Sequence, residues 1–251
     1  MNYQQFNHRK FNIHYFQEIG STNSHLLQKA QINQANEFDV IVSDIQTKGR
    51  GRKNRQWQSY KDNLHFSFLV KPTINIDKIS QLSLLCAVAL GKSLEEVFMQ
   101  SNIKAKINYK WPNDLLIDGK KIAGILLESS ISQSKCQFIA IGIGFNIAKN
   151  PQSSIFASTN LKALGLEVDK INFLKSFLEH FESLYQSWLN FGFENIKKIW
   201  LKKAFKLNQE LELSIDDKKT KGIFIGLDEL GNLLLDQKGQ NIQTINYAEI
   251  L

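Results

Sequence analysis

The spacing of hydrophobic positions changes several times along the chain, and each change predicts a different element. Residues 64–70 (LHFSFLV) alternate at period two, which is typical of a half-buried strand, and Pro72 ends the run. Apolar side chains at spacings of three and four predict amphipathic helices over residues 82–98 and 171–189. Residues 21–23 (STN) offer N-cap side chains, so a further helix is expected to begin there.

Shorter apolar runs between these elements predict strands that pair with nearby neighbours. Asp118-Gly119 is typical of a tight hairpin turn and separates two of the runs. This alternation of strands and helices favours an α+β fold, in which a mixed or antiparallel sheet carries helices on one face. The additional strands are expected at residues 6–19, 40–42, 106–110, 121–128 and 137–147.

After about Leu207 the pattern becomes strand-like throughout. Short strands at this spacing predict a small β-barrel of roughly 40 residues, which is too small for an independent core and should pack against the preceding part. We therefore predict two domains, residues 1–207 and residues 208–251. The strands are expected at residues 211–215, 220–227, 232–235 and 242–245, separated by turns at Asp216-Asp217, residues 228–231 and Lys238-Gly239.

Composition adds a positive balance: the 251 residues carry a formal net charge of +7, and the pI is about 9.2. Such a balance suits nucleic acid, an acidic partner or anionic substrates, whereas the simpler interpretation is a lysine-rich solvated surface. We favour the second, because no stripe of Arg and Lys with interleaved aromatic residues indicates a nucleic-acid groove. Five lysines recur at helical spacing and are expected on the wet face of a helix: Lys197, Lys198, Lys202, Lys203 and Lys206.

Nothing in the sequence favours secretion or a membrane. Residues 1–16 lack the apolar region of a signal peptide, and the longest apolar stretches, residues 82–90 and 138–148, are shorter than the about 20 residues that cross a bilayer. Cys86 and Cys136 have no metal-ligand spacing and are expected to be reduced. We therefore expect a soluble cytoplasmic protein without a membrane partner.

Candidate chemistry is concentrated in two segments. Residues 49–57 (GRGRKNRQW) combine four cations with two glycines, which allow close backbone approach, and one aromatic ring. Arginine supplies planar donors that match carboxylate and phosphate, so this loop is suited to close over a small anion. Residues 110–116 (KWPNDLL) add a lysine and a carboxylate. No Walker sequence, Rossmann fingerprint, nucleophile triad or metal-ligand cluster accompanies them, and His65 and His180 are expected to be structural.

These segments belong to a set of five motifs by which the chain resembles the biotin protein ligases. The motifs occur in the family order and span about residues 20–146, whereas the C-terminal strands match more loosely. Each motif alone is a modest signal, but agreement of all five by chance is negligible. The motifs are Ser21-Thr22-Asn23, Gln46 followed by Gly49-Arg50-Gly51-Arg52, Lys110-Trp111-Pro112-Asn113-Asp114, Lys121-Ile122-Ala123-Gly124-Ile125 and Gly142-Ile143-Gly144-Phe145-Asn146.

The resemblance implies a role for each matching residue. Arg52, Lys121 and Lys110 would be the catalytic cations, which neutralise the two anions that meet when a carboxylic acid attacks ATP. Asp114 would bind Mg²⁺ or orient a neighbouring group. The biotin-binding residues would be Ser21, Thr22, Asn23, Gln46, Gly49, Arg50, Gly51, Arg52, Lys121 and Gly124. The residues that bind ATP and the adenylate would be Arg50, Arg52, Arg55, Trp57, Lys110, Asn113, Lys121 and Asn146, with Gly144 near the adenine.

Several of these residues also have a purely structural interpretation. Residues 21–23 could be no more than a helix cap, and Arg55 could simply be solvated. Trp111 and Pro112 are expected to be scaffold. Asn54 stands where many family members have glycine, and because asparagine tolerates left-handed φ, the turn of the loop is expected to survive.

The activity implied by the resemblance is a two-step ligation. Biotin and Mg-ATP would give biotinyl-5′-adenylate and pyrophosphate, and a lysine of a biotin carboxyl carrier protein, such as that of acetyl-CoA carboxylase, would then displace AMP. The family fold is a biotin/lipoate ligase-like catalytic domain with an SH3-like C-terminal barrel, in monomers or homodimers. Only about 20 residues precede Ser21, whereas a DNA-reading domain needs roughly 50, so neither repression nor specific DNA binding is expected.

Two other functions remain open at this point. A lipoate or octanoate ligase shares the fold, but it would lack the paired GRGR and KWPND segments. A non-enzymatic regulator that binds biotin or a nucleotide would not need both Arg52 and Lys121. Biotin ligation is therefore favoured, and turnover with a carrier domain distinguishes the three.

Overall fold

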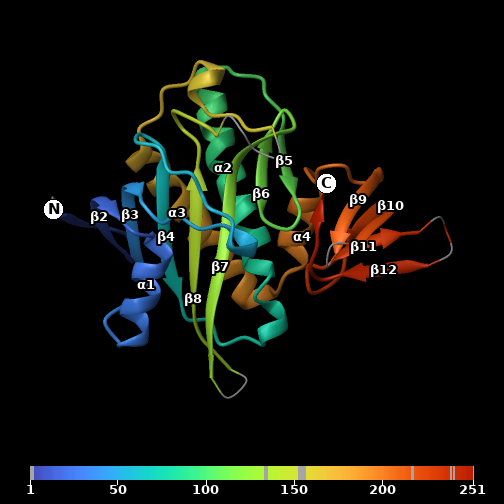
Figure 1. Cartoon of the computed structure of the whole chain (residues 1–251), viewed down its shortest axis with the longest axis horizontal. Coiled ribbons are helices and arrows are strands. Elements are labelled where there is room, and N and C mark those ends of the chain that lie inside the picture. The colour runs from blue at the N-terminus through green and yellow to red at the C-terminus, as the bar shows by residue number, and fades with distance from the viewer. Residues whose placement is uncertain are drawn as a thin grey trace.

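The larger part of the chain folds around one eight-stranded sheet, in the strand order β1-β2-β3-β4-β8-β7-β6-β5 (Figure 1). The computed structural model describes residues 3–132, 135–151, 157–215, 218–237, 239 and 241–250. β2 and β3 run parallel and the other neighbours run antiparallel, so the sheet is mixed, as the sequence predicts. The strands are β1 (Tyr3–His8), β2 (Phe11–Ile19), β3 (Asp39–Gln46), β4 (Leu64–Val70), β5 (Ile107–Lys110), β6 (Asp114–Ile117), β7 (Lys120–Ser132) and β8 (Lys135–Phe145).

Two tight turns join strands that are neighbours in this sheet. The predicted Asp118-Gly119 turn joins β6 to β7, and both residues have positive φ, at 48° and 75°. The single strand expected over residues 6–19 is instead the hairpin of β1 and β2, because the chain reverses at Arg9, whose φ is 51°. β1 was not recognised as a separate strand because most of its side chains are exposed and leave no clear apolar alternation.

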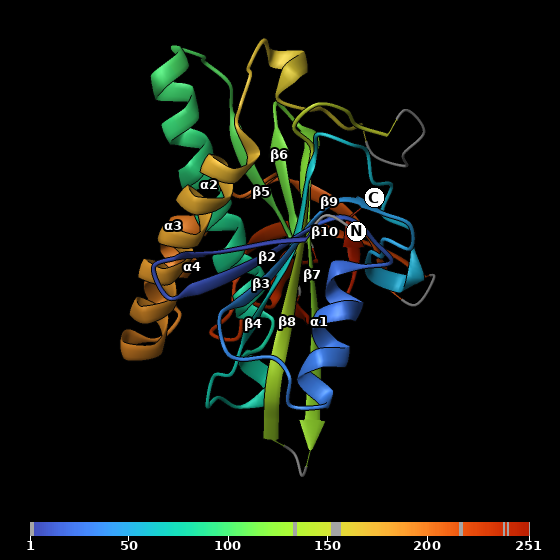
Figure 2. The ribbon, with the colours of Figure 1, turned by 90° about the vertical axis from the view of Figure 1, so that its left-hand side faces the viewer.

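Three helices, α2, α3 and α4, cover one face of the sheet, as predicted (Figure 2). The core beneath them is aromatic: Phe181 of α3 packs edge-on against Phe68 of β4, with 4.6 Å between the ring centroids. α1 lies on the opposite face, where Leu26 is fully buried over β3, β4 and β8, so the prediction of helices on one face holds for three helices and fails for α1. Because both faces are covered at this point, β4 is buried along its whole length and not half-buried as predicted. The helices are α1 (Thr22–Gln31), α2 (Gln81–Ser101), α3 (Lys170–Phe191) and α4 (Glu194–Leu201), with short 3₁₀ turns η1 (Arg52–Asn54), η2 (Ile76–Lys78) and η3 (Lys162–Leu164).

Local hydrogen bonds set the helix ends. α1 begins where predicted, because Ser21 is its N-cap and Ser21 Oγ accepts from Ser24 N at 3.4 Å. α4 ends at Leu201 with Lys202 as its C-cap, so the expectation that all five lysines share one helical face is wrong for Lys203 and Lys206, which lie beyond the cap. The chain leaves the helix there because it turns to pair with β5, where Tyr109 N donates to Lys203 O at 2.9 Å.

The C-terminal residues form a second sheet of five antiparallel strands, in the order β12-β11-β10-β9-β13. The predicted turn at residues 228–231 is present, and Asp228 Oδ1 accepts from the backbone N–H groups of Leu230 and Asn232. In the described part of the chain the edge strands β12 and β13 share no ladder, so the predicted barrel is an open sheet; β13, at two residues, is too short to close it. The predicted turn residues Asp216, Asp217 and Lys238 lie outside the described residues. The strands are β9 (Glu210–Ile215), β10 (Lys218–Leu227), β11 (Leu233–Asp236), β12 (Ile242–Ile245) and β13 (Glu249–Ile250).

The second sheet packs beside β5, β6 and α4 and shares one continuous core with the first (Figure 1). Trp111 Nε1 donates to Gly231 O at 3.0 Å, and the Trp200 ring lies edge-on to Phe224 at 6.4 Å between centroids. A Cβ at Gly231 would lie 2.9 Å from a methyl of Leu84 on α2. Trp111 therefore has the expected scaffold role, and the C-terminal strands are held next to the end of β5.

The histidines and cysteines noted in the sequence lie in packed elements. His65 is fully buried in β4, and burial lowers its pKa to about 4, so it is neutral at physiological pH. His180 of α3 lies 2.8 Å from Glu96 of α2, between Nε2 and Oε1. Cys86 and Cys136 are both free. Among the described helices, none has both the length and the apolar composition needed to cross a membrane.

Candidate active site

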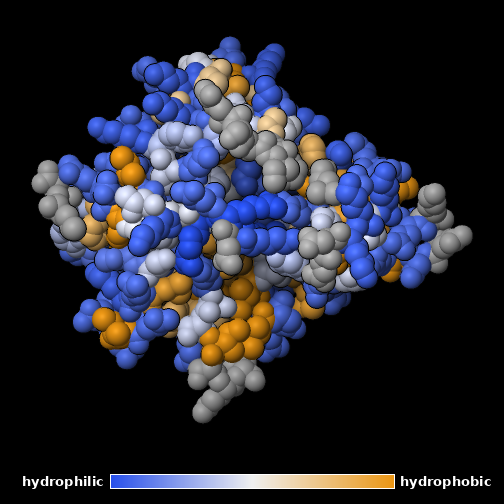
Figure 3. Space-filling model, viewed as in Figure 1, coloured by the Kyte–Doolittle hydropathy of each residue, from blue (hydrophilic) through white to orange (hydrophobic). Residues whose placement is uncertain are grey.

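The motifs predicted from the sequence meet around one cavity of about 330 Å³. It lies over β7 and β8, between the start of α1, the loop after β3 and strand β13, and this part of the face shown in Figure 3 is predominantly hydrophilic. Of the predicted site residues, those that line the cavity are Ser21, Thr22, Asn23, Gln46, Arg50, Gly51, Arg52, Arg55, Trp57, Lys110, Asn113, Asp114, Lys121, Gly124, Gly144 and Asn146.

The arginine-glycine loop (residues 49–57) folds back on itself beside the cavity. Trp57 N donates to Gly49 O at 3.0 Å. A Cβ at Gly49 would lie 2.6 Å from Trp57 O, so this glycine serves the close approach of two backbone segments. Gly49 was predicted to bind biotin, but it is not among the described residues that line the cavity, whereas the other predicted site residues are. The left-handed residue of the turn is Lys53, with φ of 55°, a position that the sequence did not single out.

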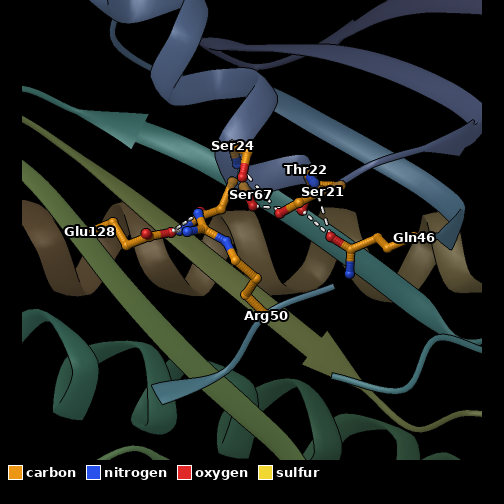
Figure 4. Close-up of polar contacts among 8 residues, drawn as sticks. Ser21, Thr22, Ser24, Gln46, Arg50, Ser67 and Glu128 are labelled. Carbon is orange, nitrogen blue, oxygen red and sulfur yellow. Dashed lines mark hydrogen bonds and ion pairs between the residues drawn. The ribbon is translucent and has the colours of Figure 1, made fainter. Parts of the chain in front are cut away.

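Thr22, Gln46 and Ser67 form a neutral hydrogen-bonded group at the start of α1, which we call the polar corner (Figure 4). Thr22 N and Oγ1 both donate to Gln46 Oε1, at 2.9 and 3.1 Å, and Thr22 Oγ1 lies 2.7 Å from Ser67 Oγ. Both lone pairs of Gln46 Oε1 are thereby engaged, and Gln46 Nε2 reaches Ser59 Oγ only at 3.4 Å. The polar corner therefore offers an amide donor and hydroxyl groups to the cavity.

Beside the polar corner, Glu128 of β7 connects α1 to the arginine-glycine loop. Its Oε2 accepts from Asn23 Nδ2 at 2.6 Å and from Arg50 Nη2 at 2.8 Å. Figure 4 shows Glu128 and Arg50 pointing toward each other from β7 and from the loop. The two donors differ in environment, since Asn23 is 3% exposed and the Arg50 side chain 42% exposed.

Three glycines of β7 and β8 form the floor of the cavity. Gly124 and Gly144 are paired across the two strands, and Gly142 is the next residue on that face of β8. A Cβ at Gly144 would lie 2.2 Å from Trp57 Cε2, and one at Gly142 would lie 2.9 Å from Asn23 Oδ1. Any larger residue at these positions would displace the indole or the amide, so the flat floor is what allows both side chains to lie where they do.

Lys121 and Arg52 bring positive charge to the side of the cavity near β6. Lys121 Nζ pairs with Asp114 Oδ1 at 2.6 Å and lies 5.7 Å from the centroid of the Trp57 ring. Arg52 Nη1 donates to Asn113 Oδ1 at 3.3 Å. Burial lowers the pKa of Arg52, yet a guanidinium remains charged at any physiological pH. Charges in such a partly desolvated site act more strongly on an anion than they would in water.

Lys110 is the most buried of the predicted cations. It is 7% exposed at the end of β5, and its Nζ donates to Ile250 O at 3.1 Å. Burial lowers its pKa to about 8, although Asp114 raises it in part. The charge of Lys110 is therefore sensitive to pH close to neutrality.

Strand β13 and the residues before it bound the cavity from the C-terminal sheet. Both terminal nitrogens of Arg55 pair with the carboxylate of Glu249, so Arg55 is engaged and not simply solvated. The Arg52 guanidinium and Lys53 Nζ lie 4.9 and 5.4 Å from the centroid of the Tyr247 ring. The arginine-glycine loop is thus tied to the second sheet by charged contacts.

Three buried polar atoms around the cavity have no hydrogen-bond partner among the described residues: Asn23 Oδ1, Trp57 Nε1 and Asn146 Oδ1. The other end of the Asn146 amide is engaged, since Nδ2 donates to Thr159 O at 3.1 Å. An unpaired buried group costs about 1–3 kcal/mol. A ligand with one acceptor and two donors at matching places would remove that cost.

The residues that escaped the sequence reasoning include four whose side chains contact predicted site residues: Ser67, Glu128, Tyr247 and Glu249. Ser67 left a signal, because it is a polar residue in the apolar run of β4, and Glu128 left another, because it continues the period-two face of Gly124 on β7. Tyr247 and Glu249 left none. They follow the loop by more than a hundred residues, and only the packing of the two sheets brings them to it.

Comparison with known proteins gives an independent result. Residues 15–146 match the model of the Biotin/lipoate A/B protein ligase family, and residues 206–251 match that of the Biotin protein ligase C terminal domain. The Bifunctional ligase/repressor BirA of Bacillus subtilis (strain 168) is 34% identical over 224 residues, which cover 87% of this chain and 67% of that protein.

Two further proteins align with most of this chain and with most of their own length. The Biotin--[acetyl-CoA-carboxylase] ligase of Paracoccus denitrificans is 31% identical over 201 residues, which cover 78% of this chain and 82% of that protein. The solved structure of the biotin protein ligase from Aquifex aeolicus in complex with biotin and ATP is similar with a TM-score of 0.81 and 28% identity, covering 96% of this chain and 98% of that chain. The likeness therefore extends through both sheets.

Proposed function

The chain belongs to the Biotin/lipoate A/B protein ligase family, and from this premise we propose how its residues perform the reaction. It is a biotin protein ligase (EC 6.3.4.15), which attaches biotin to protein in an ATP-dependent reaction. The biotin carboxylate attacks the α-phosphate of ATP and releases pyrophosphate. The ε-amine of a carrier lysine then attacks the carbonyl of biotinyl-5′-adenylate and releases AMP, so no covalent enzyme intermediate is needed.

The observation that carries the proposed residue roles is that one cavity joins a neutral polar corner to a group of cations. The ring system of biotin is a cyclic urea, with one carbonyl acceptor and two N–H donors, whereas its other end is a carboxylate. The polar corner has the hydrogen-bonding groups for the urea, and Lys121 and Arg52 have the charge for the carboxylate. The arrangement suits a ligand that is polar but uncharged at one end and anionic at the other.

At the neutral end, Gln46 Nε2 would donate to the urea carbonyl. The hydroxyl protons of Thr22 and Ser67 are already engaged, so their oxygens would accept from a urea N–H. Asn23 Oδ1, which has no partner among the described residues, would accept a urea N–H. Ser21 is the N-cap of α1 and holds the first turn of the helix in place. Its role would therefore be partly structural and partly a contact with the ligand. Each correct pairing avoids the cost of an unpaired buried group.

At the charged end, Lys121 and Arg52 would neutralise the carboxylate and the α-phosphate as they approach. The five-coordinate phosphorus of the transition state carries more charge on its oxygens than the ground state, so fixed cations stabilise it preferentially. Asp114, paired with Lys121 Nζ, would hold that ammonium in position. Arg50 and Gly51 would close over the same anions from the loop.

The remaining phosphates of ATP would meet Lys110 and Arg55, and the adenosine would lie toward Asn146 and Gly144. Asn113 would hold Arg52, since its Oδ1 accepts from that guanidinium. Trp57 would cover the adenylate and exclude water, which would otherwise hydrolyse the mixed anhydride. The loop must therefore move when ATP enters and close before chemistry.

Mg²⁺ is expected to enter with ATP and not to have a protein cage of its own. The described residues contain no group of three or more His, Cys, Asp or Glu side chains that could hold a metal ion. Asp114 could supply at most one oxygen, and that carboxylate is already paired with Lys121. Phosphate oxygens and water are the ligands that Mg²⁺ usually takes in such sites. The predicted Asp114–Mg²⁺ contact therefore stays a prediction.

The acceptor would be a lysine of the biotin carboxyl carrier domain of acetyl-CoA carboxylase or of a related carboxylase. We also propose that the enzyme works in the cytoplasm, because Cys86 and Cys136 are both free, as suits a reducing compartment. The division into a catalytic domain, residues 1–207, and a C-terminal module, residues 208–251, is part of the same proposal. The module would complete the ATP side of the cavity through β13.

The test is to incubate the protein with radiolabelled biotin, Mg-ATP and an apo carrier domain, with lipoate as a parallel substrate. Label on the carrier lysine from biotin alone is the expected result. Adenylate without transfer would indicate a non-cognate carrier, and transfer of lipoate instead would identify a lipoate ligase. Binding of biotin without any adenylate would contradict the proposal and favour a binding protein.

A further inference from the structure

Glu128 occupies a place on β7 to which the reaction above assigns no role. Side chains of a strand alternate between its faces, so Glu128 lies on the same face as Gly124 and Leu126, which line the cavity. It stands at the rim of the cavity and lines a smaller adjoining hollow of about 260 Å³ with Arg50 and Leu126. The carboxylate is therefore close to the site without being among the residues of its wall.

One oxygen of this carboxylate accepts from two different segments. Glu128 Oε2 lies 2.6 Å from Asn23 Nδ2, in the first turn of α1, and 2.8 Å from Arg50 Nη2, in the arginine-glycine loop. The pair with Arg50 is partly exposed, and such pairs are screened by water and contribute little. The bond from Asn23 is different, because that amide is 3% exposed and a charge-assisted bond to it is screened much less.

The chemistry of a carboxylate fixes which end of the Asn23 amide it meets. An ionised carboxylate can only accept, so it must face the amide nitrogen and never the amide oxygen. The oxygen is then turned to the other side, where it lies next to Gly142 of the cavity floor; a Cβ on that glycine would be 2.9 Å away. Asn23 Oδ1 is buried and has no partner among the described residues.

We propose that Glu128 is a positioning residue that sets the polarity of the Asn23 amide, so that biotin meets an acceptor and not a donor at this point of the cavity. The inference rests on the proposed function, since it assigns to Asn23 Oδ1 a urea N–H of biotin. Glu128 acts through Asn23 and does not touch the reacting atoms. Without this carboxylate the Asn23 amide could flip between two orientations. In one of them its NH₂ group would face the N–H of the ligand, and two donors would meet.

The first experiment measures biotin binding by calorimetry and steady-state kinetics for Glu128→Ala. We expect the Kd and the KM for biotin to rise about tenfold, the loss of one good hydrogen bond, whereas kcat and the KM for ATP change by less than about twofold. Glu96→Ala is the matched control. Glu96 also accepts two side-chain hydrogen bonds, from Ser176 and His180, but lies between α2 and α3, and its removal should leave biotin binding unchanged.

The second experiment exchanges the two groups. Asn23→Asp alone places two carboxylates at hydrogen-bond distance, so biotin binding should weaken about a hundredfold or more. Adding Glu128→Gln restores one amide and one carboxylate in reversed order, with an oxygen still on the side of Gly142, and should recover at least tenfold of that loss. A role that is merely structural would not give this recovery.

The outcomes separate this inference from the proposed function. If the unmodified protein neither binds biotin nor forms adenylate, the proposed function fails. If it does both, but Glu128→Ala binds biotin within twofold of it, the positioning role is wrong. It is also wrong if Glu128→Ala lowers kcat, raises both KM values and lowers Tm together, or if the exchange variant binds no better than Asn23→Asp. A tenfold change in biotin affinity alone, with recovery on exchange, supports it.

Discussion

The two ends of the cavity are built in opposite ways. The polar corner consists of uncharged, buried or half-buried residues from elements that are already neighbours in the sheet and its helix, and its hydrogen bonds are made before any ligand arrives. The cationic end is assembled from the arginine-glycine loop, the end of β5 and the start of β7, beside strand β13. Its groups are charged, several are exposed, and they pair with carboxylates that a substrate must replace or rearrange.

This difference separates recognition from activation. A preformed neutral corner loses little entropy when it binds, and it discriminates by the cost of leaving a polar group unpaired. A cationic end held by ion pairs is stable without substrate, yet the same charges become available for phosphate and carboxylate once the loop moves. Substitutions at one end should therefore alter binding, and substitutions at the other should alter turnover.

The sharpest test of this separation is Lys121→Ala at the cationic end. Loss of a cation that acts on the transition state should lower kcat about 10²–10³-fold, or roughly 3–4 kcal/mol, while the Kd for biotin changes only a few-fold. Quenched-flow formation of adenylate and calorimetry measure the two effects. Lys120→Ala, at the adjacent exposed residue, is the control. An equal loss of biotin affinity in Lys121→Ala would abolish the distinction between the ends.

Thr22→Val makes the complementary change at the polar corner. Valine keeps the shape of threonine but removes the hydroxyl that bonds Gln46 and Ser67. We expect the KM for biotin to rise roughly tenfold to a hundredfold, because Gln46 Oε1 loses one of its two donors and Ser67 Oγ loses its partner, with kcat within about twofold. Thr244→Val, on exposed β12, controls for loss of a hydroxyl elsewhere. A fall in kcat without a rise in KM would contradict this assignment.

Lys110 makes the cationic end sensitive to pH. Its pKa is about 8 in the folded protein, so it loses its charge as the pH rises through 8, and kcat/KM for ATP should fall up to tenfold per unit above that point. Lys110→Arg should remove this fall over the same range. Its contribution to stability has the opposite sign: between pH 8 and the unfolded value of 10.5, the unfolded chain binds more protons, so stability rises with pH. A flat profile for the unmodified protein would mean that ATP does not depend on this charge.

The smallest effect is expected from Glu249→Gln, which weakens the tie between the loop and β13. The Arg55 side chain of this pair is 47% exposed, so the pair should contribute no more than about 1 kcal/mol. The KM for ATP should change by less than about fivefold, and the difference should vanish at roughly 1 M salt. Glu212→Gln, whose carboxylate pairs with Lys219 away from the cavity, is the control. A large loss of kcat would show that β13 does more than hold the loop.

How much of the fold could be read from the sequence depended on whether its signals were local. The turn at Asp118-Gly119 and the cap at Ser21 are local, and both were predicted correctly. The strand β4 was also predicted at its observed residues, but it is buried along its whole length and not half-buried. The position of α1 was predicted wrongly, on the same face as the other helices, because an amphipathic helix has one apolar face whichever side of the sheet it covers. The open form of the second sheet also depended on strand lengths, and β13 was not predicted at all.

The same division applies to the candidate site. Residues within the motifs converge on the cavity because each motif lies at the start or end of a strand, or at the start of α1, at the same part of the sheet. Glu249 could not be found this way, since its partner Arg55 is 194 residues away. The ligand contacts of individual residues and the absence of repressor activity stay predictions. Residues 3–19 form β1 and β2 of the sheet. A gel shift with biotin operon DNA would test the predicted absence of repressor activity.

Trp57 lies on the glycine floor in a different setting from the other three tryptophans. Trp111, Trp188 and Trp200 are 3%, 4% and 1% exposed in rigid packing, whereas Trp57 is only partly buried and belongs to the loop that must move. An indole that leaves this floor for water changes its fluorescence emission, while the three core indoles contribute a constant background. The molecule thus contains an intrinsic optical reporter at its cavity, with which the opening and closing of the loop can be timed in unlabelled protein.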